Sequence, residues 1–183
     1  LARIYNGSDP EYDIMVVKYA AATGTALWAS PAVYNYASNP YPDDAYDIAA
    51  DTGGAYVAGS VNNSIALLWF PSDGSAPTLK QPETGTGNYT AAYGVDVRAG
   101  YVALAGSLYN DSSWNTDIWA AQFTTAPVLA HMWSSTFTST IGYDEARAVK
   151  IDASSNVWVA GNYYTYDSYQ DIWLGKYDER GNL

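Results

Sequence analysis

The chain has 183 residues, of which 48% are hydrophobic and 15% aromatic, including 18 Tyr and 7 Trp. This is enough apolar material for a sizeable core, and the richness in Tyr, Trp, Gly, Ser, Thr, Asn and Asp favours strands joined by turns. Nineteen acidic residues against eight basic ones give a formal charge of −11, which repels phosphate backbones and anionic lipid and argues against a nucleic-acid partner. Cysteine is absent, which excludes disulfides, thiolate chemistry and cysteine-based metal sites.

Taken in chain order, the sequence predicts short strands that recur in a fixed set of four. The first strand of the set carries an early Ala, the second ends in Ala-Gly, the third mostly begins Asp-Ile, and the fourth bears a Trp. The strands with a recognisable sequence are the tail of a second strand at 1–7, DIMVVKY at 13–19 and ALWASPAVY at 26–34; DAYDIAAD at 44–51, AYVAG at 55–59 and SIALLWF at 64–70; AAYGVDVR at 91–98, VALAG at 102–106, DIWAAQF at 117–123 and HMWSSTF at 131–137; and EARAVKID at 145–152, VWVAG at 157–161 and DIWLGKY at 171–177.

The spacing of these strands indicates a structural repeat. The third strand recurs at Ile14, Ile65, Ile118 and Ile172, at intervals of 51, 53 and 54 residues. Loops of variable length on a fixed scaffold produce such a drifting period. Four short antiparallel strands per period of about 50 residues predict the blade of a β-propeller. We therefore expect an all-β fold with about 14 strands, or three and a half blades, in a single propeller segment over 1–183. The expected blade pieces are 1–36 (partial), 41–80, 88–138 and 143–183 (partial).

The closing phrases IDASSNVWVAG at 151–161, DIWLGKYD at 171–178 and KYDERGN at 176–182 resemble the bacterial and archaeal seven-bladed β-propeller repeat family. The second copy departs from that pattern, because LLWFPSDGSAPTLK at 67–80 replaces its Lys-Tyr-Asp and Trp positions. The resemblance implies the propeller fold and frequent extracellular or surface placement. It implies no single activity and no catalytic residues.

Three and a half blades do not close a propeller, so we expect a completion. It could come from further blades of a longer parent chain, from a second copy forming a ring of about seven blades, or from subunits joined head to tail. Strand pairing across the open edges is one way to join such subunits. The missing strand differs between the two ends, which favours a longer parent or a polymer over a two-copy ring.

The sequence also bears on where the protein is found. No apolar run approaches the roughly 18 residues of a membrane span, and the chain shows neither an initial Met nor a signal-like stretch, so we expect a processed product or a segment of something longer. Together with the acidity and the richness in Tyr, Ser, Thr and Asn, four N-glycosylation sequons predict an extracellular or cell-surface glycoprotein. The sequons begin at Asn6, Asn62, Asn88 and Asn110.

Reactive groups are few apart from carboxylates. His131 is the only histidine and is expected to be a partly exposed edge-strand residue, with no Ser or acid at a spacing diagnostic of a catalytic triad. Acids that recur in phase predict a repeated structural task, such as accepting hydrogen bonds from turn N–H groups. The in-phase acids are Asp13, Asp117 and Asp171 at the third strand and Asp44 and Glu145 at the first; the cluster of Asp43, Asp44 and Asp47 is a weaker candidate for a hydrolytic or ion site.

Calcium is the one cofactor that the sequence suggests, and only weakly. Asp152, Ser154 and Asn156 place oxygen-bearing side chains at alternate positions of one turn, as hard-cation loops do. The central Gly and distal Glu of an EF-hand are missing. A plain hairpin turn therefore explains these residues better, and no cofactor is predicted otherwise.

The aromatic residues fall into two groups. Trp119 and Trp173 occupy the same position of the third strand and are predicted to lie in the core between blades. A second group lies in loops, where Tyr and Trp suit a protein interface or sugar stacking. This ligand or interface group consists of Tyr34, Tyr36, Tyr41, Trp114, Tyr163, Tyr164, Tyr166 and Tyr169.

These observations predict a non-catalytic extracellular or cell-surface scaffold that assembles with further copies of itself, or with the remaining blades of a longer chain, through incomplete terminal blades and Tyr-rich loops. The assembly would be a ring, a filament, or a surface-layer or adhesion component. The alternative is a carbohydrate-binding or hydrolytic propeller cut from a larger secreted enzyme, for which glycans are the partners. A third hypothesis is a propeller stabilised by calcium.

Overall fold

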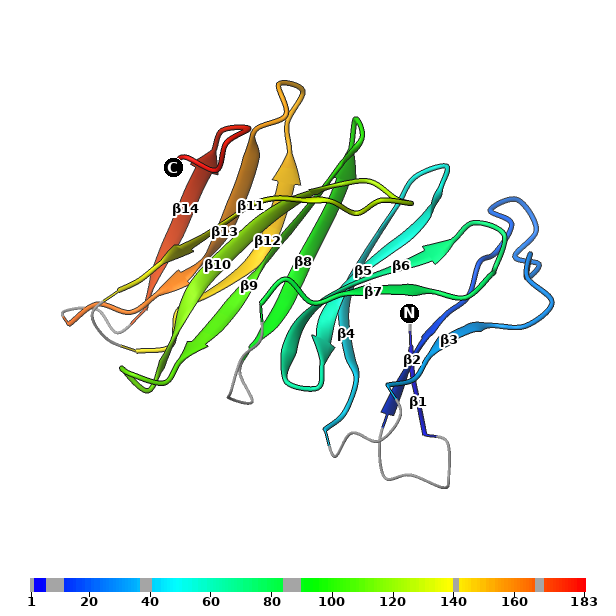
Figure 1. The fold of residues 1–183 in the computed structure, drawn as a ribbon, viewed down its shortest axis with the longest axis horizontal. Helices are drawn as coiled ribbons and strands as arrows, with labels where there is room; N and C mark the ends of the chain where they lie inside the picture. The colour runs from blue at the N-terminus through cyan, green and yellow to red at the C-terminus, as the bar shows by residue number, and fades with distance from the viewer. Residues whose placement is uncertain (1, 6–11, 37–40, 84–89, 140–141, 167–169) are drawn as a thin grey trace.

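A computed structural model describes residues 2–5, 12–36, 41–83, 90–139, 142–166 and 170–183 of the chain (Figure 1). In these ranges the protein is all-β, with four antiparallel sheets and no helix, which confirms the all-β part of the predicted fold class. Accordingly, no helix in the described ranges is long and apolar enough to cross a membrane.

Each sheet follows the chain order of its strands, with neighbours in sequence paired as neighbours in space. Fourteen strands are present in the described residues, as the repeat predicts. The first sheet has β1 (Ala2–Tyr5), β2 (Tyr12–Val16) and β3 (Ala32–Tyr34); the second has β4 (Asp44–Ala50), β5 (Gly54–Val61), β6 (Ser64–Pro71) and β7 (Thr78–Lys80); the third has β8 (Ala91–Arg98), β9 (Tyr101–Asn110), β10 (Asn115–Thr124) and β11 (His131–Phe137); the fourth has β12 (Glu145–Ile151), β13 (Val157–Tyr163) and β14 (Asp171–Tyr177).

Two strands of the first sheet are shorter than the sequence predicts: the strand expected at 13–19 spans Tyr12–Val16, and the one expected at 26–34 is shorter still. The expected strand at 26–34 is reduced to β3 (Ala32–Tyr34), preceded by a bend and by an isolated bridge between Tyr19 and Ala26. Pro31 precedes β3 and has no N–H to donate to a ladder, which accounts for the break.

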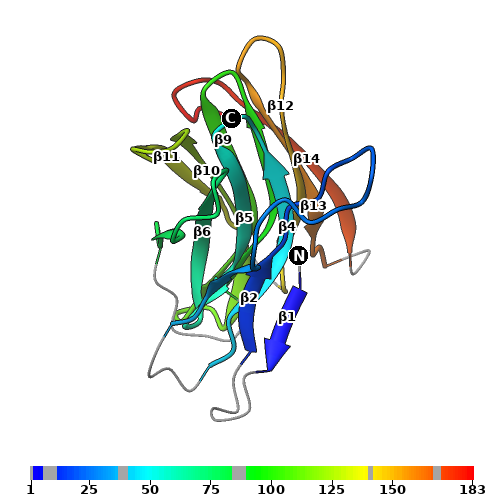
Figure 2. The same cartoon turned by 90° about the vertical axis from the view of Figure 1, so that its right-hand side faces the viewer.

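The four sheets lie side by side, from the first sheet on the right of Figure 1 to the fourth on the left. From the side, in Figure 2, they overlap one behind another. The first strand of the third sheet, β8, contacts both β4 and β12, so the first strands of three sheets are neighbours in space. Three hydrophobic clusters fill the spaces between consecutive sheets, one cluster for each pair.

The alternation of side chains along the third strand explains this arrangement. Ile14, Ile65 and Ile118 are fully buried, and each belongs to the cluster between its own sheet and the next one. Residues one position later point to the other face. Trp119 and Trp173 stand at that position, and each packs in the cluster shared with the preceding sheet, which confirms their predicted core role.

Two tryptophans anchor their sheets against a glycine of the following sheet. Trp28 lies on Gly74, and Trp133 lies on Gly181; both glycines occupy the turn after a third strand and have φ near +80°. A Cβ on these glycines would lie 3.1 Å from the Trp28 ring and 2.8 Å from the Trp133 ring. The two tryptophans therefore have equivalent surroundings although only Trp133 lies in a strand.

We expect Trp119→Ala to destabilise the protein by about 3–5 kcal/mol, because it leaves a large cavity between the second and third sheets. Trp119 is 1% exposed, whereas Trp114, in the hairpin that precedes it, is 77% exposed. Trp114→Ala is the matched control and should change the free energy of unfolding by about 0.5 kcal/mol or less. Urea denaturation followed by circular dichroism measures both values. Equal losses for the two variants would contradict the burial of Trp119 between sheets.

Candidate functional site: the outer sheet faces and the tyrosine-rich end

A carboxylate just before the first strand holds the loops in two of the sheets. Asp144 is fully buried; its Oδ2 accepts a hydrogen bond from the Ser139 N–H (3.2 Å) and its Oδ1 accepts one from the Tyr164 N–H (2.8 Å). Asp43 accepts from the Tyr36 N–H (3.1 Å) in the same way. The predicted structural task of Asp44 and Glu145 is thus performed by the residue before each of them.

Two of the three acids at the third strand, Asp117 and Asp171, also have structural partners. Asp117 is buried, and its Oδ2 accepts a hydrogen bond from the Asn110 side-chain amide (3.1 Å). Burial raises the pKa of Asp117, and hydrogen bonds from Asn110 and Thr138 partly offset that effect. Asp171 accepts a hydrogen bond from the Thr165 hydroxyl (3.3 Å). Both acids tie the start of a third strand to neighbouring residues.

The Asp43, Asp44 and Asp47 cluster is divided among separate tasks. While Asp43 holds the loop before β4, the Asp47 carboxylate accepts hydrogen bonds from the Ile48 N–H (2.8 Å) and from the Val95 N–H of β8 (3.0 Å). Asp47 therefore links the second sheet to the third. In the described residues, no group of three His, Cys, Asp or Glu side chains is arranged to hold a metal ion.

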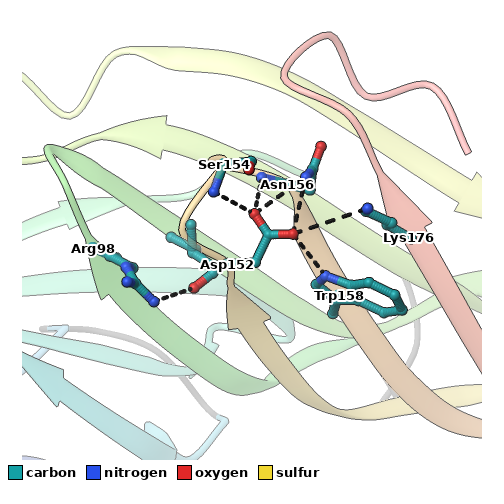
Figure 3. Close-up of polar contacts among 7 residues, drawn as sticks. Arg98, Asp152, Ser154, Asn156, Trp158 and Lys176 are labelled. Atoms are coloured by element: carbon teal, nitrogen blue, oxygen red, sulfur yellow. Dashed lines mark hydrogen bonds and ion pairs between the residues drawn. The ribbon is translucent and has the colours of Figure 1, made fainter.

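Asp152 forms a closed hydrogen-bonded turn between β12 and β13 (Figure 3). Its Oδ1 accepts from the N–H groups of Ser154 (2.8 Å) and Asn156 (3.0 Å), and its Oδ2 accepts from the Asn156 amide (2.9 Å) and the Trp158 indole (3.0 Å). These hydrogen bonds, led by those from Asn156 and Trp158, hold the pKa of Asp152 well below its usual range. Donor groups surround the carboxylate on the sides where calcium would require oxygen ligands, which favours the hairpin-turn interpretation.

The predicted loop aromatics lie at one end of the sheets. The β5–β6 and β9–β10 hairpins and the starts of the first strands β4, β8 and β12 lie at that end, which is the lower edge of Figure 1. We call it the tyrosine-rich end. Tyr34 lies in β3 and Tyr36 and Tyr41 in the connection to β4, Trp114 in the β9–β10 hairpin, Tyr163 at the end of β13, and Tyr164 and Tyr166 after it; Tyr169 lies outside the described residues.

Only some of these aromatics are available to a ligand. Tyr163 packs edge-on against Phe137, with ring centroids 6.2 Å apart. Burial, together with the nearby Asp43 and Tyr36, raises the pKa of Tyr34 to about 12. Tyr166 is 80% exposed. Tyr164 and Tyr41 line two different clefts at this end.

His131 and two of the sequons can be placed in the structure. His131 is exposed in the edge strand β11, as predicted, with its ring edge-on to Phe123 at 5.3 Å between centroids. Asn62 is exposed in the β5–β6 hairpin. Asn110 donates its side-chain amide, the group that would carry a glycan, to Asp117. Asn6 and Asn88 lie outside the described residues.

The outer face of the fourth sheet is apolar and exposed. Ile172 and Leu174 are 85% and 64% exposed, and Trp158 is partly exposed beside them. Strand register makes these residues equivalent to Ile118, Ala120 and Ala103 of the third sheet, which are fully buried against the fourth. We call Trp158, Ile172 and Leu174 the leading face.

The outer face of the first sheet presents the complementary set. Met15 and Val17 are partly exposed and Tyr19 is 61% exposed. By their place in the third strand they correspond to Trp119, Ala121 and Phe123, which pack on the second sheet. We call Met15, Val17 and Tyr19 the trailing face. The molecule thus exposes both halves of an interface that it forms three times internally.

Comparison of the chain with protein-family models and with curated proteins finds no match.

We expect Asp152→Asn to lower the melting temperature at pH 7, because the variant replaces a charged acceptor of several hydrogen bonds. The pKa of Asp152 is lowered in the folded protein, so its stabilising contribution is fully present above about pH 5 and is lost as the pH falls through the folded-state pKa. The difference in melting temperature between wild type and variant should therefore shrink below about pH 4. Glu179→Gln, an equal change of charge at an exposed site, is the control. A difference that does not vary with pH would contradict this role.

Proposed function

We propose that the chain is a β-propeller segment that works as a non-catalytic scaffold, and that copies of it join head to tail through the leading and trailing faces. The observation that carries this proposal is the exposure of Ile172 and Leu174 at positions that are buried in the preceding sheets. Large apolar side chains in one contiguous exposed patch mark an interaction site.

Register supports a second copy as the occupant of the leading face. The internal interfaces place residues such as Ile65 and Leu67 of one sheet against residues such as Trp119 and Phe123 of the next. The leading face repeats the first pattern, and the trailing face repeats the second. A trailing face on a leading face therefore continues the packing already present between sheets, with no new kind of contact.

Such a contact is heterologous, because two different surfaces meet. Heterologous contacts generate a ring when the rotation between copies closes and a filament when it does not. In a propeller, consecutive four-stranded antiparallel blades have their first strands as neighbours. The second and third sheets have this arrangement, which supports a ring. An acidic surface with a formal charge of −11 and the exposed sequon at Asn62 support an extracellular or cell-surface setting.

We expect wild-type protein to associate with rising concentration, and we expect Ile172→Lys with Leu174→Lys to remain a monomer of 19.8 kDa. Two lysines on the leading face would have to be buried without partners in the interface. Size-exclusion chromatography with light scattering measures the masses. Val128→Lys, an exposed apolar residue outside both faces, is the matched control and should associate like wild type.

A mixing experiment tests the head-to-tail geometry. Tyr19→Lys alters only the trailing face and should also be monomeric. Mixed with the leading-face double variant, it should form a dimer and nothing larger, because each variant keeps one intact face and the two faces are complementary. A wild-type protein that stays monomeric up to its solubility limit would overturn the proposal, and so would a mixture that stays monomeric.

A further inference from the structure

A cleft opens at the tyrosine-rich end between the first strands β8 and β12. Its volume is about 280 Å³, near the lower end of the range for small-molecule sites. Three tyrosine rings line it, from β8, from the connection before β12 and from the connection after β13. Polar side chains converge on the same space. The lining includes Tyr93, Tyr143 and Tyr164 with Ser107, Glu145 and Gln170.

The ring of Tyr164 is fixed in place. The Tyr164 N–H donates to the fully buried Asp144 (2.8 Å). Its ring lies on Gly142, which has φ of +85° and where a Cβ would come within 2.3 Å of the ring. This wall of the cleft is therefore built before any ligand arrives, which reduces the entropy cost of binding.

Tyr93 belongs to a row of side chains that crosses three sheets. Tyr46, Tyr93 and Arg147 occupy the same register position of β4, β8 and β12. The Tyr46 and Tyr93 rings meet edge to face with centroids 5.0 Å apart, and the Arg147 guanidinium lies 4.5 Å from the Tyr93 centroid. Arg147 also forms an ion pair with Glu145. The cleft is thus lined by aromatic rings and a carboxylate, and a guanidinium contacts two of the lining residues, Tyr93 and Glu145.

We propose that this cleft binds a neutral carbohydrate. A sugar ring has an apolar face of C–H groups, which suits tyrosine rings, and a rim of hydroxyls that both donate and accept hydrogen bonds. Glu145 can accept such bonds, and Gln170 can both donate and accept. The match between an apolar wall and mixed donors and acceptors at the rim is the recognition chemistry of a polyol.

Charge argues against the other ligand classes. Anionic ligands meet Glu145 and a protein of formal charge −11. Organic cations favour aromatic rings beside a carboxylate, but the Arg147 guanidinium already lies over Tyr93 and pairs with Glu145. A cationic ligand would have to compete with that internal cation for both groups. A neutral ligand has no such competitor.

A second cleft repeats the position of the first. It lies between β4 and β8, has a volume of about 300 Å³, and is lined by Tyr46 and Ser60, the register equivalents of Tyr93 and Ser107. Ala91 of β8 stands there in place of Glu145, and the carboxylate in its lining, Asp44, comes from the preceding sheet. The cleft between β8 and β12 is therefore the one with a carboxylate on the following sheet, and we assign the binding site to it.

Saturation-transfer difference NMR on the wild-type chain tests this assignment, with cellotetraose, mannotetraose and N-acetylchitotetraose as neutral probes. At least one probe should receive saturation. Tyr143→Ala, at a half-exposed ring whose loss leaves the core intact, should raise the dissociation constant about tenfold, and Glu145→Gln should raise it severalfold.

Tyr166→Ala is the matched control, because Tyr166 is an exposed tyrosine at the same end that does not line the cleft. It should leave the dissociation constant unchanged, and the melting temperature should be close to that of the wild type for all variants. Three results would overturn the proposal: no saturation of any neutral probe, an equal loss of binding in Tyr166→Ala, or displacement of the sugar by tetramethylammonium. The oligomeric state is measured separately, so failure here leaves the head-to-tail proposal standing.

Discussion

Face-to-face packing of consecutive sheets is the constraint on which the rest of this structure depends. A sheet of three or four short strands buries little by itself, so each one needs a neighbour on both faces. The third strand meets that need through simple alternation: Ile65 faces the following sheet while Ala66, next to it, faces the preceding one. Every other feature of the chain has to leave this alternation undisturbed.

Carboxylates complete the packing where apolar contacts cannot. The first strands of neighbouring sheets are not paired with one another, so some of their backbone N–H groups need acceptors from elsewhere. Asp47 accepts from Val95 N–H across one junction, and Asp96 accepts from Ile151 N–H (2.8 Å) across the next. These hydrogen bonds fix how far one sheet is shifted relative to the next along the strand direction. Part of the acidity of the chain is therefore structural, whatever its effect on partners.

Much of the fold could be predicted from the sequence because the repeat keeps its phase. Equivalent isoleucines and tryptophans identify the third strands, and their alternation assigns Trp119 to the core. Local detail was less predictable. Asp43 and Asp44 are adjacent acids, and sequence does not distinguish which one points into the loop, since successive side chains of an extended segment point to opposite sides. The shortening of the strand before Tyr34 follows from Pro31, a single residue inside an otherwise strand-like run.

The candidate cleft was the least predictable feature. Clustering along the chain identifies Tyr164 as a candidate, yet Tyr93 lies about 70 residues away in an ordinary first strand, and the sequence predicts only a structural task for Glu145. Only the contact between β8 and β12 brings them together. The clustering of aromatic residues in loops also selects residues outside the site, because Trp114 and Tyr166 are exposed without lining this cleft.

Some positions of the repeat are constrained by packing and others are free to vary, which explains why a ligand site would arise at the start of the first strands. Positions that face a neighbouring sheet must remain apolar and of fitting volume, since close-packed interiors tolerate little change. At the tyrosine-rich end the side chains face neither neighbour fully, so the repeat can differ there without loss of core packing. Register-equivalent positions hold Asp44, Ala91 and Glu145 in successive sheets. The same scaffold can therefore present different side chains at each junction between sheets. Of the two junctions between the described first strands β4, β8 and β12, the one between β8 and β12 places a carboxylate of the following sheet beside a row of aromatic rings.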